Sequence, residues 1–379
     1  MRKILIVVAI VVVIAIAIVA ALMFTTAPRF ARAVDLIARV PASAEVFAII
    51  PNAGVLDAKA HLNPITRAAL EKWSAGHRLP PAWMLGSGDL IVWKSGGEVR
   101  YIAHTDRLRA MFVHNAPDEP PLDAATAAQL RALAARLPAG DALVVQRESG
   151  HGAYPPIDRP TATSVQITPG EIVLTSVGRS SVPPDGAKSV PHLSFPRGAI
   201  LSAAFTQPPR VVSDLNRLFG AKVSALFDEG GMICIYDVDA HKLLPRPLGV
   251  IVLPDDPVRR AIVDRFKQAE AVGIRVRTAV VGNTIAVAFD DSIDQYQKDA
   301  FDPAPEAKQW SVRIDAPRLV PILNDLQQNI GLRLAAPRLF RSTRDLDAWL
   351  GELEQAKSIE ATDSADSQVE TLQARIRAK

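Results

Sequence analysis

A strand–turn–strand pattern recurs along this chain and limits the folds open to it. Runs rich in β-branched and aromatic residues flank short turns at Ser95-Gly96-Gly97, at Pro169-Gly170 and at Gly282-Asn283. Such turns join antiparallel strands, whereas parallel strands need a long crossover that is usually a helix. The pattern therefore favours antiparallel sheets over the main alternative, a parallel α/β sheet.

Helical segments separate these hairpins. Apolar residues recur every three to four positions in Pro64–Gly76, Leu122–Gly140, Pro208–Gly220 and Asp255–Gly273. The order strand, helix, strand pair, helix, strand pair appears about twice and starts again near Gln309. In this interpretation the hairpin in Thr278–Tyr296 is the counterpart of the hairpin in Thr163–Ser176. The sequence predicts an α+β fold of antiparallel sheets with helices packed on one face, built from about two and a half repeated units.

Three predicted regions follow from this layout. Residues 1–28 form an N-terminal transmembrane anchor, and residues 29–180 form a first α+β unit. Residues 198–379 form a second α+β unit, with a partial third unit from about 308. The segment Ser180–Gly198 between the units is rich in Pro, Ser and Gly, which is typical of a linker or long loop.

The anchor prediction rests on Ile4–Phe24, 21 residues without a charge or a proline. As a helix this run spans roughly 31 Å, close to the thickness of a bilayer core. One alternative is a cleavable signal peptide, but its apolar core is usually only about 7–15 residues long. A buried core helix is a second alternative. The length of the run favours a retained transmembrane helix.

The charges around this run do not decide its orientation. Arg2 and Lys3 precede it, and Arg29, Arg32 and Arg39 follow it, so the positive-inside rule shows no clear bias. A very short tail before the first apolar run normally stays in the cytoplasm. We therefore expect a single-pass protein of the bacterial inner (cytoplasmic) membrane, with its C-terminal domain in the periplasm or outside.

Composition excludes some functions and structural devices. The net charge is +3 and there is no dense block of Lys and Arg, so we expect no nucleic-acid partner. Apolar residues make up 49% of the chain, enough for a sizeable core. Cys234 is the only cysteine, which excludes an internal disulfide. Because it lies in an apolar run, we expect a buried core residue; a reactive thiol is the alternative.

The histidines do not form a recognisable metal motif. None of the seven is spaced from another histidine, a cysteine or a carboxylate as zinc ligands are. His104 and Asp106 flank Thr105 at a predicted strand end, and His114 lies eight residues beyond Asp106. A metal or acid–base site is an alternative there, but polar residues exposed at a turn explain the pattern better.

Two further motifs fail the tests for ion and nucleotide binding. Asp237–Lys242 has two closely spaced carboxylates, but Lys242 and Leu248 stand where a calcium loop needs Gly and Glu. A polar hairpin turn is the better interpretation. The glycines in Leu85–Leu90 lack a third glycine and precede a predicted strand, so they form neither a dinucleotide-binding nor a phosphate-binding loop.

Two remaining motifs have structural or surface interpretations. Asp290, Asp291 and Ser292 stand at the start of a predicted helix, where side-chain oxygens satisfy free N–H groups; a catalytic carboxylate pair is the alternative. Trp83 and Met84 lie in a predicted loop and are candidates for contact with a membrane or a partner.

Three stretches resemble those of a known group of proteins. Val40–Ile50 opens a strand with Val-Pro-Ala, Pro317–Leu326 is a helix led by proline, and in Val280–Tyr296 a hairpin runs into an Asp-rich helix start. The combination resembles a loosely defined family of bacterial membrane-anchored envelope proteins that carry a domain of unknown function with repeated strand–helix–hairpin units. The resemblance implies no catalytic residue, cofactor or substrate.

No catalytic, cofactor-binding or metal-binding residue is therefore predicted. We expect a non-enzymatic structural or interaction module, attached to the membrane through Ile4–Phe24 and bound to another envelope protein. The alternative is a periplasmic binding or carrier module for an apolar ligand such as lipid. An enzyme of unrecognised type is the third possibility. A carrier requires a continuous apolar cavity, whereas a scaffold requires a filled core.

Overall fold

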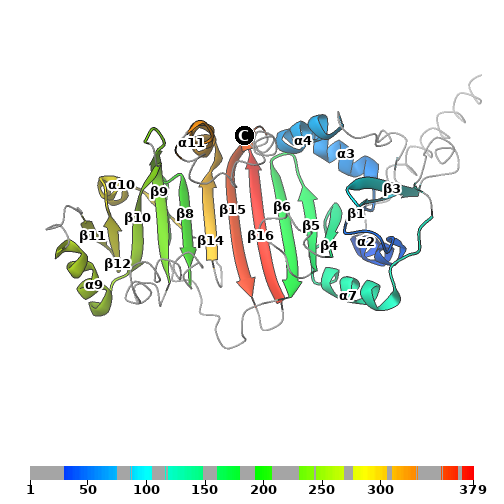
Figure 1. Ribbon diagram of the computed structural model, residues 1–379, viewed down its shortest axis with the longest axis horizontal. Helices are drawn as coiled ribbons and strands as arrows, with labels where there is room; N and C mark the ends of the chain where they lie inside the picture. The colour runs from blue at the N-terminus through cyan, green and yellow to red at the C-terminus, as the bar shows by residue number, and fades with distance from the viewer. Residues whose placement is uncertain are drawn as a thin grey trace, which may run out of the picture. The chain divides into compact units, whose positions relative to one another are not determined.

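The structure is a computed structural model (Figure 1). It describes residues 30–74, 86, 88–104, 116, 118–147, 160–179, 193–206, 230–242, 245–268, 276–304, 310–329, 331, 351, 353–365 and 369–379. The chain divides into two compact units, Met1–Gly178 and Arg179–Lys379, called the first and second unit below. The predicted anchor Ile4–Phe24 lies outside the described residues. Within them, no helix combines the length and the apolar character needed to cross a membrane.

The first unit is an antiparallel sheet with helices. Its elements are α2 (Phe30–Leu36), the 3-10 helix η1 (Ile37–Arg39), β1 (Val46–Ile50), α3 (Ala53–Leu62), α4 (Pro64–Ser74), β2 (Asp89–Ser95), β3 (Glu98–His104), α7 (Ala124–Ala134), β4 (Ala142–Gln146), β5 (Thr161–Ile167) and β6 (Glu171–Arg179). The strand order is β3-β2-β1-β4-β5-β6, and every neighbouring pair is antiparallel.

The second unit is also antiparallel. Its elements are β7 (Ser194–Pro196), β8 (Leu201–Phe205), β9 (Gly231–Asp239), β10 (Arg246–Pro254), α9 (Pro257–Gln268), β11 (Arg277–Val281), β12 (Thr284–Ala288), α10 (Ser292–Lys298), β13 (Phe301–Pro303), β14 (Trp310–Asp315), α11 (Ala316–Gln328), β15 (Ala356–Ala365) and β16 (Val369–Ala378). The main order is β11-β12-β10-β9-β8-β14-β15-β16, and β13 pairs with β7. The predicted α+β class with antiparallel pairing is confirmed.

Six strands of each unit follow the same order. In the first unit this order is β3-β2-β1-β4-β5-β6, and in the second unit it is β10-β9-β8-β14-β15-β16. β1 and β8 therefore have equivalent positions, and so do β5–β6 and β15–β16. The counterpart of the β5–β6 hairpin is therefore β15–β16. The predicted match between β5–β6 and the hairpin in Thr278–Tyr296 is wrong, because that hairpin, β11–β12, extends the sheet beyond β10. A hairpin pattern predicts the pairing of its own two strands but not the edge that they join.

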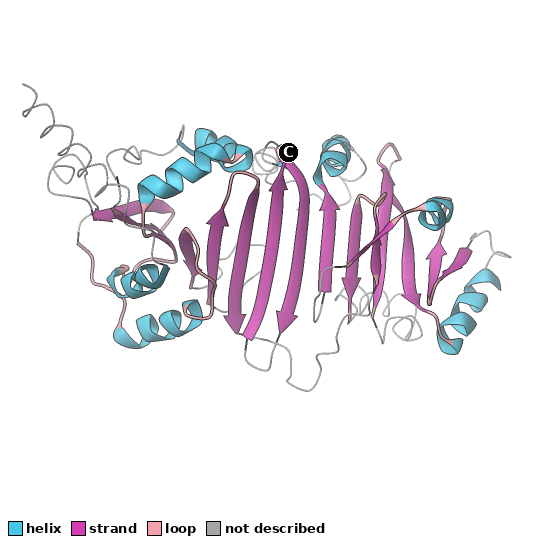
Figure 2. Ribbon diagram, turned by 180° about the vertical axis from the view of Figure 1, so that it is seen from behind, coloured by secondary structure: helices cyan, strands magenta, loops and turns pink. Residues whose placement is uncertain are grey.

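Helices cover both faces of the second sheet (Figures 1 and 2). Val263 of α9 packs against Ile285 and Val287 of β12, whereas Ile293 of α10 packs in a cluster with Ala286. Neighbouring residues of a strand point to opposite faces. The predicted packing of helices on one face is therefore wrong here. All five residues of β12 are buried, so its apolar run requires cover on both sides.

In the first unit, α2 and α7 lie against one face of the sheet. α2 contacts β1 and β4, and α7 contacts β5. The buried apolar strand side chains on this face include Phe47, Ile49, Ile91, Trp93, Leu143, Val145 and Ala162. α7 begins where predicted, because the Asp123 carboxylate accepts a hydrogen bond from the Thr126 N–H at 2.8 Å.

The predicted linker Ser180–Gly198 ends inside the core. Residues 180–192 lie outside the described residues, but Phe195 of β7 is fully buried and packs against the second sheet. Its neighbour Ser194 is exposed, whereas Pro196 is also buried. A three-residue strand between prolines is too short to produce a periodic pattern, which explains why the sequence predicts a loop here.

Candidate functional site: an apolar sheet face

One face of the second sheet consists of apolar side chains that are only half-buried. Along most of β8 and the first part of β9, fully buried residues alternate with half-buried ones, and in β14 only Ser311 is fully buried. The half-buried residues on one face of these strands are apolar, and include Ala203, Ile233 and Val312. Ala203 pairs with both Ile233 and Val312, so the three side chains form a row on the same face.

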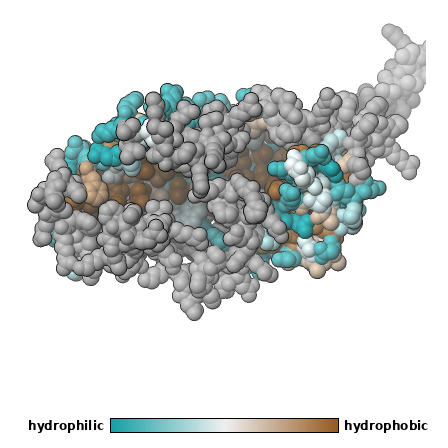
Figure 3. Space-filling model, in the orientation of Figure 1, coloured by the Kyte–Doolittle hydropathy of each residue, from teal (hydrophilic) through white to brown (hydrophobic). Residues whose placement is uncertain are grey.

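The row continues across β15 and β16. Ala361 pairs with Val312 and with Ala374, and Ile359 pairs with Ile314 and Ile376. We call this surface the apolar face: Leu201, Ala203, Ile233, Ile235, Val312, Ile314, Ile359, Ala361, Leu372, Ala374 and Ile376, all half-buried. Figure 3 is turned to this side of the second unit and shows brown, apolar surface between the grey atoms.

The opposite face of β15 and β16 is polar. It carries Glu360, Thr362, Gln373, Arg375 and Arg377, and Arg377 lies 3.4 Å from Glu360 in an ion pair. The hairpin is thus amphipathic, with alternating apolar and polar residues. Half-buried aliphatic side chains still contact water, so covering them further is favourable by about 25 cal/mol per Å². An apolar surface of this kind is typical of a binding site.

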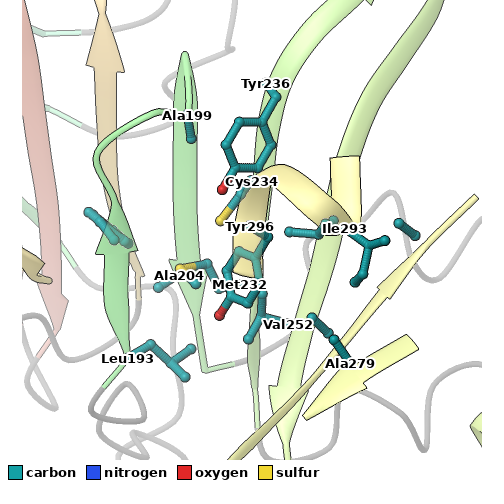
Figure 4. Close-up of a cluster of buried hydrophobic side chains, with 14 residues drawn as sticks. Leu193, Ala199, Ala204, Met232, Cys234, Tyr236, Val252, Ala279, Ile293 and Tyr296 are labelled. Atoms are coloured by element: carbon teal, nitrogen blue, oxygen red, sulfur yellow. The ribbon is translucent and has the colours of Figure 1, made fainter. Parts of the chain in front are cut away.

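A closed core lies on the other face of β8–β10 (Figure 4). Met232, Cys234 and Tyr236 of β9 point into it and meet Tyr296 of α10. Burial raises the pKa of the Cys234 thiol to about 12, so the thiol stays protonated at neutral pH. The predicted core role of Cys234 is confirmed. The Tyr236 hydroxyl donates to Asp299 Oδ2 at 3.2 Å, and burial also raises the pKa of Tyr236.

A second group of polar residues lies at the start of β2. The Asp89 side chain is 2% exposed, and its Oδ2 is 2.7 Å from Arg32 Nη2. Asp89 Oδ1 is buried and has no hydrogen-bond partner among the described residues. His104 is exposed at the end of β3, opposite Asp89. Burial raises the pKa of Asp89, whereas partial burial and the Arg39 guanidinium lower the pKa of His104.

Asp89 should therefore cost the first unit stability at neutral pH. Because burial raises its pKa in the folded state, ionisation is more costly there than in the unfolded chain. We expect Asp89→Asn to raise the free energy of unfolding at pH 7. This gain should shrink as the pH falls through the raised folded pKa toward the ordinary value near 3.8, where the wild-type carboxyl is protonated.

The full chain in detergent is unfolded with urea at several pH values, and hydrogen exchange of the β2 and β3 amides reports the stability of the first unit. Asp118→Asn, which alters an exposed aspartate of the same unit, is the matched control and should leave stability within about 0.5 kcal/mol. A loss of stability in Asp89→Asn at pH 7 would show that the ion pair with Arg32 outweighs the cost of burial.

The acidic motifs have the structural roles that the sequence predicts, with one change. Asp237–Lys242 forms the end of β9 and the turn that follows it, with Lys242 paired to Asp239 at 3.0 Å. At the start of α10, Asp290 rather than Asp291 satisfies a helix N–H: its Oδ1 accepts from Ser292 at 2.8 Å. Asp291, at the N-cap position, makes no capping bond and pairs with Arg277.

Other candidate residues are not brought together. Gly86 lies at a turn before β2, so the residues after the paired glycines form a strand, as predicted. Asp106, His114, Trp83 and Met84 lie outside the described residues. Among the residues that the structure describes, no group of three His, Cys, Asp or Glu side chains is placed to hold a metal ion.

The apolar face was not found from the sequence, although part of its signal is visible there. In β16, Leu372, Ala374 and Ile376 alternate with polar residues. This alternation predicts a strand with one apolar side. It does not show that the same side continues across β15, β14, β8 and β9, because those strands are distant in the sequence. No family model, curated protein or solved structure matches the chain.

Proposed function

We propose that this chain is a non-enzymatic envelope protein whose second unit binds a partner protein through the apolar face. Ile4–Phe24 holds it in the bacterial inner membrane, with the remaining chain in the periplasm. The observation that carries the proposal is the row of half-buried apolar side chains across β8, β9, β14, β15 and β16.

The dimensions of the face favour a protein partner. Five neighbouring strands, spaced by about 4.8 Å, make a surface roughly 20 Å wide. An α-helix with its side chains is about 10 Å in diameter, so an amphipathic helix fits within this width. Its apolar residues, three to four positions apart, would pack between the Ile, Val and Leu side chains of the face.

An apolar ligand such as lipid is the second candidate. The apolar face contains only aliphatic side chains, so it suits an acyl chain as well as a protein side chain. Asp363 and Glu370, which lie on the same side of the hairpin, are acidic, and Asp363 is buried, so neither offers a positive charge to hold an anionic headgroup. This lack of a basic anchor is the reason for placing the lipid second, since ligand sites usually include a few polar groups that set orientation.

The two candidates are tested with one pair of variants. Gln373 and Ala374 are neighbours on β16 that point to opposite faces, and both are half-buried. Ala374→Glu places a carboxylate on the apolar face, while Gln373→Glu adds the same charge on the polar face. Because burying an unpaired carboxylate is costly, we expect Ala374→Glu to lower partner capture at least about tenfold and Gln373→Glu to leave it unchanged.

Capture is measured in membranes that contain the full-length chain, with a photo-crosslinking residue at Ala361 on the apolar face. The same residue at Thr362 is the control for the other face. A crosslinked protein that depends on Ala361 and is lost in Ala374→Glu supports the proposal. Crosslinks to lipid alone would favour the carrier. Equal capture by both variants would contradict a role for the apolar face.

A further inference from the structure

The strand β11 has one edge without a described partner. It is the last strand of the second sheet and pairs only with β12 among the described strands. The two strands are joined by Gly282-Asn283, and Val281 pairs with Thr284 across this turn. In a two-residue hairpin that flanking pair is hydrogen-bonded, and the bonding alternates along the ladder. Thr278 and Val280 therefore direct their N–H and C=O groups away from β12.

This edge lacks the features that usually protect edge strands from pairing. Charged residues, prolines and bulges are the common protections. The only charge in β11 is Arg277, whose guanidinium is held by Asp291 at 2.7 Å and Asp294 at 2.6 Å. The ladder with β12 has no bulge, and Val280 is 56% exposed.

The edge strand of the first unit is different. β3 carries Glu98, Arg100 and His104, and Arg100 is paired with Glu98 and Glu119. The outer carbonyl of Tyr101 accepts a hydrogen bond from the Ala116 N–H at 3.0 Å. β3 is therefore protected by charge and by a chain contact, whereas β11 has no such protection from the residues that the structure describes.

We propose that β11 pairs antiparallel with β11 of a second copy of this chain, around a two-fold axis at Ala279. In this register Thr278 lies opposite Val280 of the second copy, and the outward N–H and C=O groups of both residues are satisfied. The pair joins β-branched side chains, which stabilise neighbouring strands. With the axis at Ala279, only this central residue lies opposite its own copy, and it is uncharged, so no like charges meet at the axis. Arg277 would lie opposite Val281 of the second copy.

A second copy of this chain is a better pairing partner for the β11 edge than a strand of an unrelated protein. Two-fold dimers need a surface that is complementary to itself, and a five-residue strand centred on Ala279 has this property. The pairing would extend the antiparallel sheet of the second unit across the dimer. It leaves the apolar face available, so this inference does not depend on the proposed function.

The mass of the full-length chain in detergent, measured by sedimentation equilibrium over a range of concentrations, tests the dimer. We expect the wild type to dimerise. Val280→Lys puts an ammonium group beside the paired edge, and should weaken the dimer at least tenfold. Val99→Lys is the matched control, since Val99 is 39% exposed on the edge strand β3, and should leave the dimer unchanged.

A disulfide experiment tests the register. Chains with Thr278→Cys and chains with Val280→Cys, carrying different tags, are produced together and oxidised in the membrane. The Cα atoms of a hydrogen-bonded antiparallel pair are about 5.5 Å apart, within the range of a disulfide. We expect mixed dimers for this combination and none for Thr278→Cys with Val99→Cys. A monomeric wild type, a dimer insensitive to Val280→Lys, or absence of the mixed disulfide would overturn the inference.

Discussion

Phe195→Ala should lower the free energy of unfolding of the second unit by about 3–5 kcal/mol. Phe195 is fully buried among Ala204, Met232 and their neighbours, although β7 is only three residues long. Its ring lies 5.4 Å from the Arg313 guanidinium, an additional cation–π contact. Removing the ring leaves a cavity in the cluster that packs against the sheet.

The loss is measured by hydrogen exchange of the β8 and β9 amides in the full-length chain, which reports local opening of the sheet. Phe289→Ala is the matched control, since Phe289 is 51% exposed in the same unit. This control should change stability by less than about 0.5 kcal/mol. Equal effects of the two substitutions would show that β7 does not stabilise the sheet.

Gly230→Ala should lower the free energy of unfolding of the second unit by a comparable amount. Gly230 has a φ of 81°, a conformation that residues with a side chain rarely adopt. A Cβ at this position would overlap the carbonyl oxygen of Phe205 and lie 2.9 Å from the Thr206 Cα. Both obstacles are backbone atoms, of the last residue of β8 and of the residue after it, so no side chain can move aside. We expect destabilisation of about 3 kcal/mol or more, from backbone strain and loss of the β8–β9 ladder.

Urea unfolding of the full-length chain, with hydrogen exchange in β8 and β9, measures this effect. Gly170→Ala is the control, because a Cβ there meets no atom within 4 Å. Its effect should stay within about 1 kcal/mol. A Gly230→Ala variant as stable as this control would show that β9 can shift away from β8 at its first residue.

The alternation of apolar residues and the short turns were sufficient to predict the antiparallel α+β class. The hairpins at Gly96-Gly97, Pro169-Gly170 and Gly282-Asn283 form as expected. The helices α7, α9 and α11 also lie in segments with helical periodicity. These elements depend on local interactions along the chain, such as caps and turn geometry, which are present in the sequence.

Arrangements that join distant segments could not be predicted in the same way. The β11–β12 hairpin joins the edge of the sheet next to β10. The position that the sequence predicts for β11–β12 is occupied by the β15–β16 hairpin. The edge that a hairpin joins depends on which surfaces remain uncovered after the other elements have packed. For the same reason Phe195, in a segment with loop composition, becomes part of the core.

The sequence by itself determined the elements, the hairpin pairing and the buried state of Cys234, because composition and period act locally. The tertiary structure alone decided that α9 and α10 cover opposite faces of β12. It also joined Ala203, Ile233, Val312, Ala361 and Ala374 into one apolar face. These residues come from five strands, up to 171 positions apart in the chain from Ala203 to Ala374. Sheet register brings them together, and register is set by the packing of the whole unit.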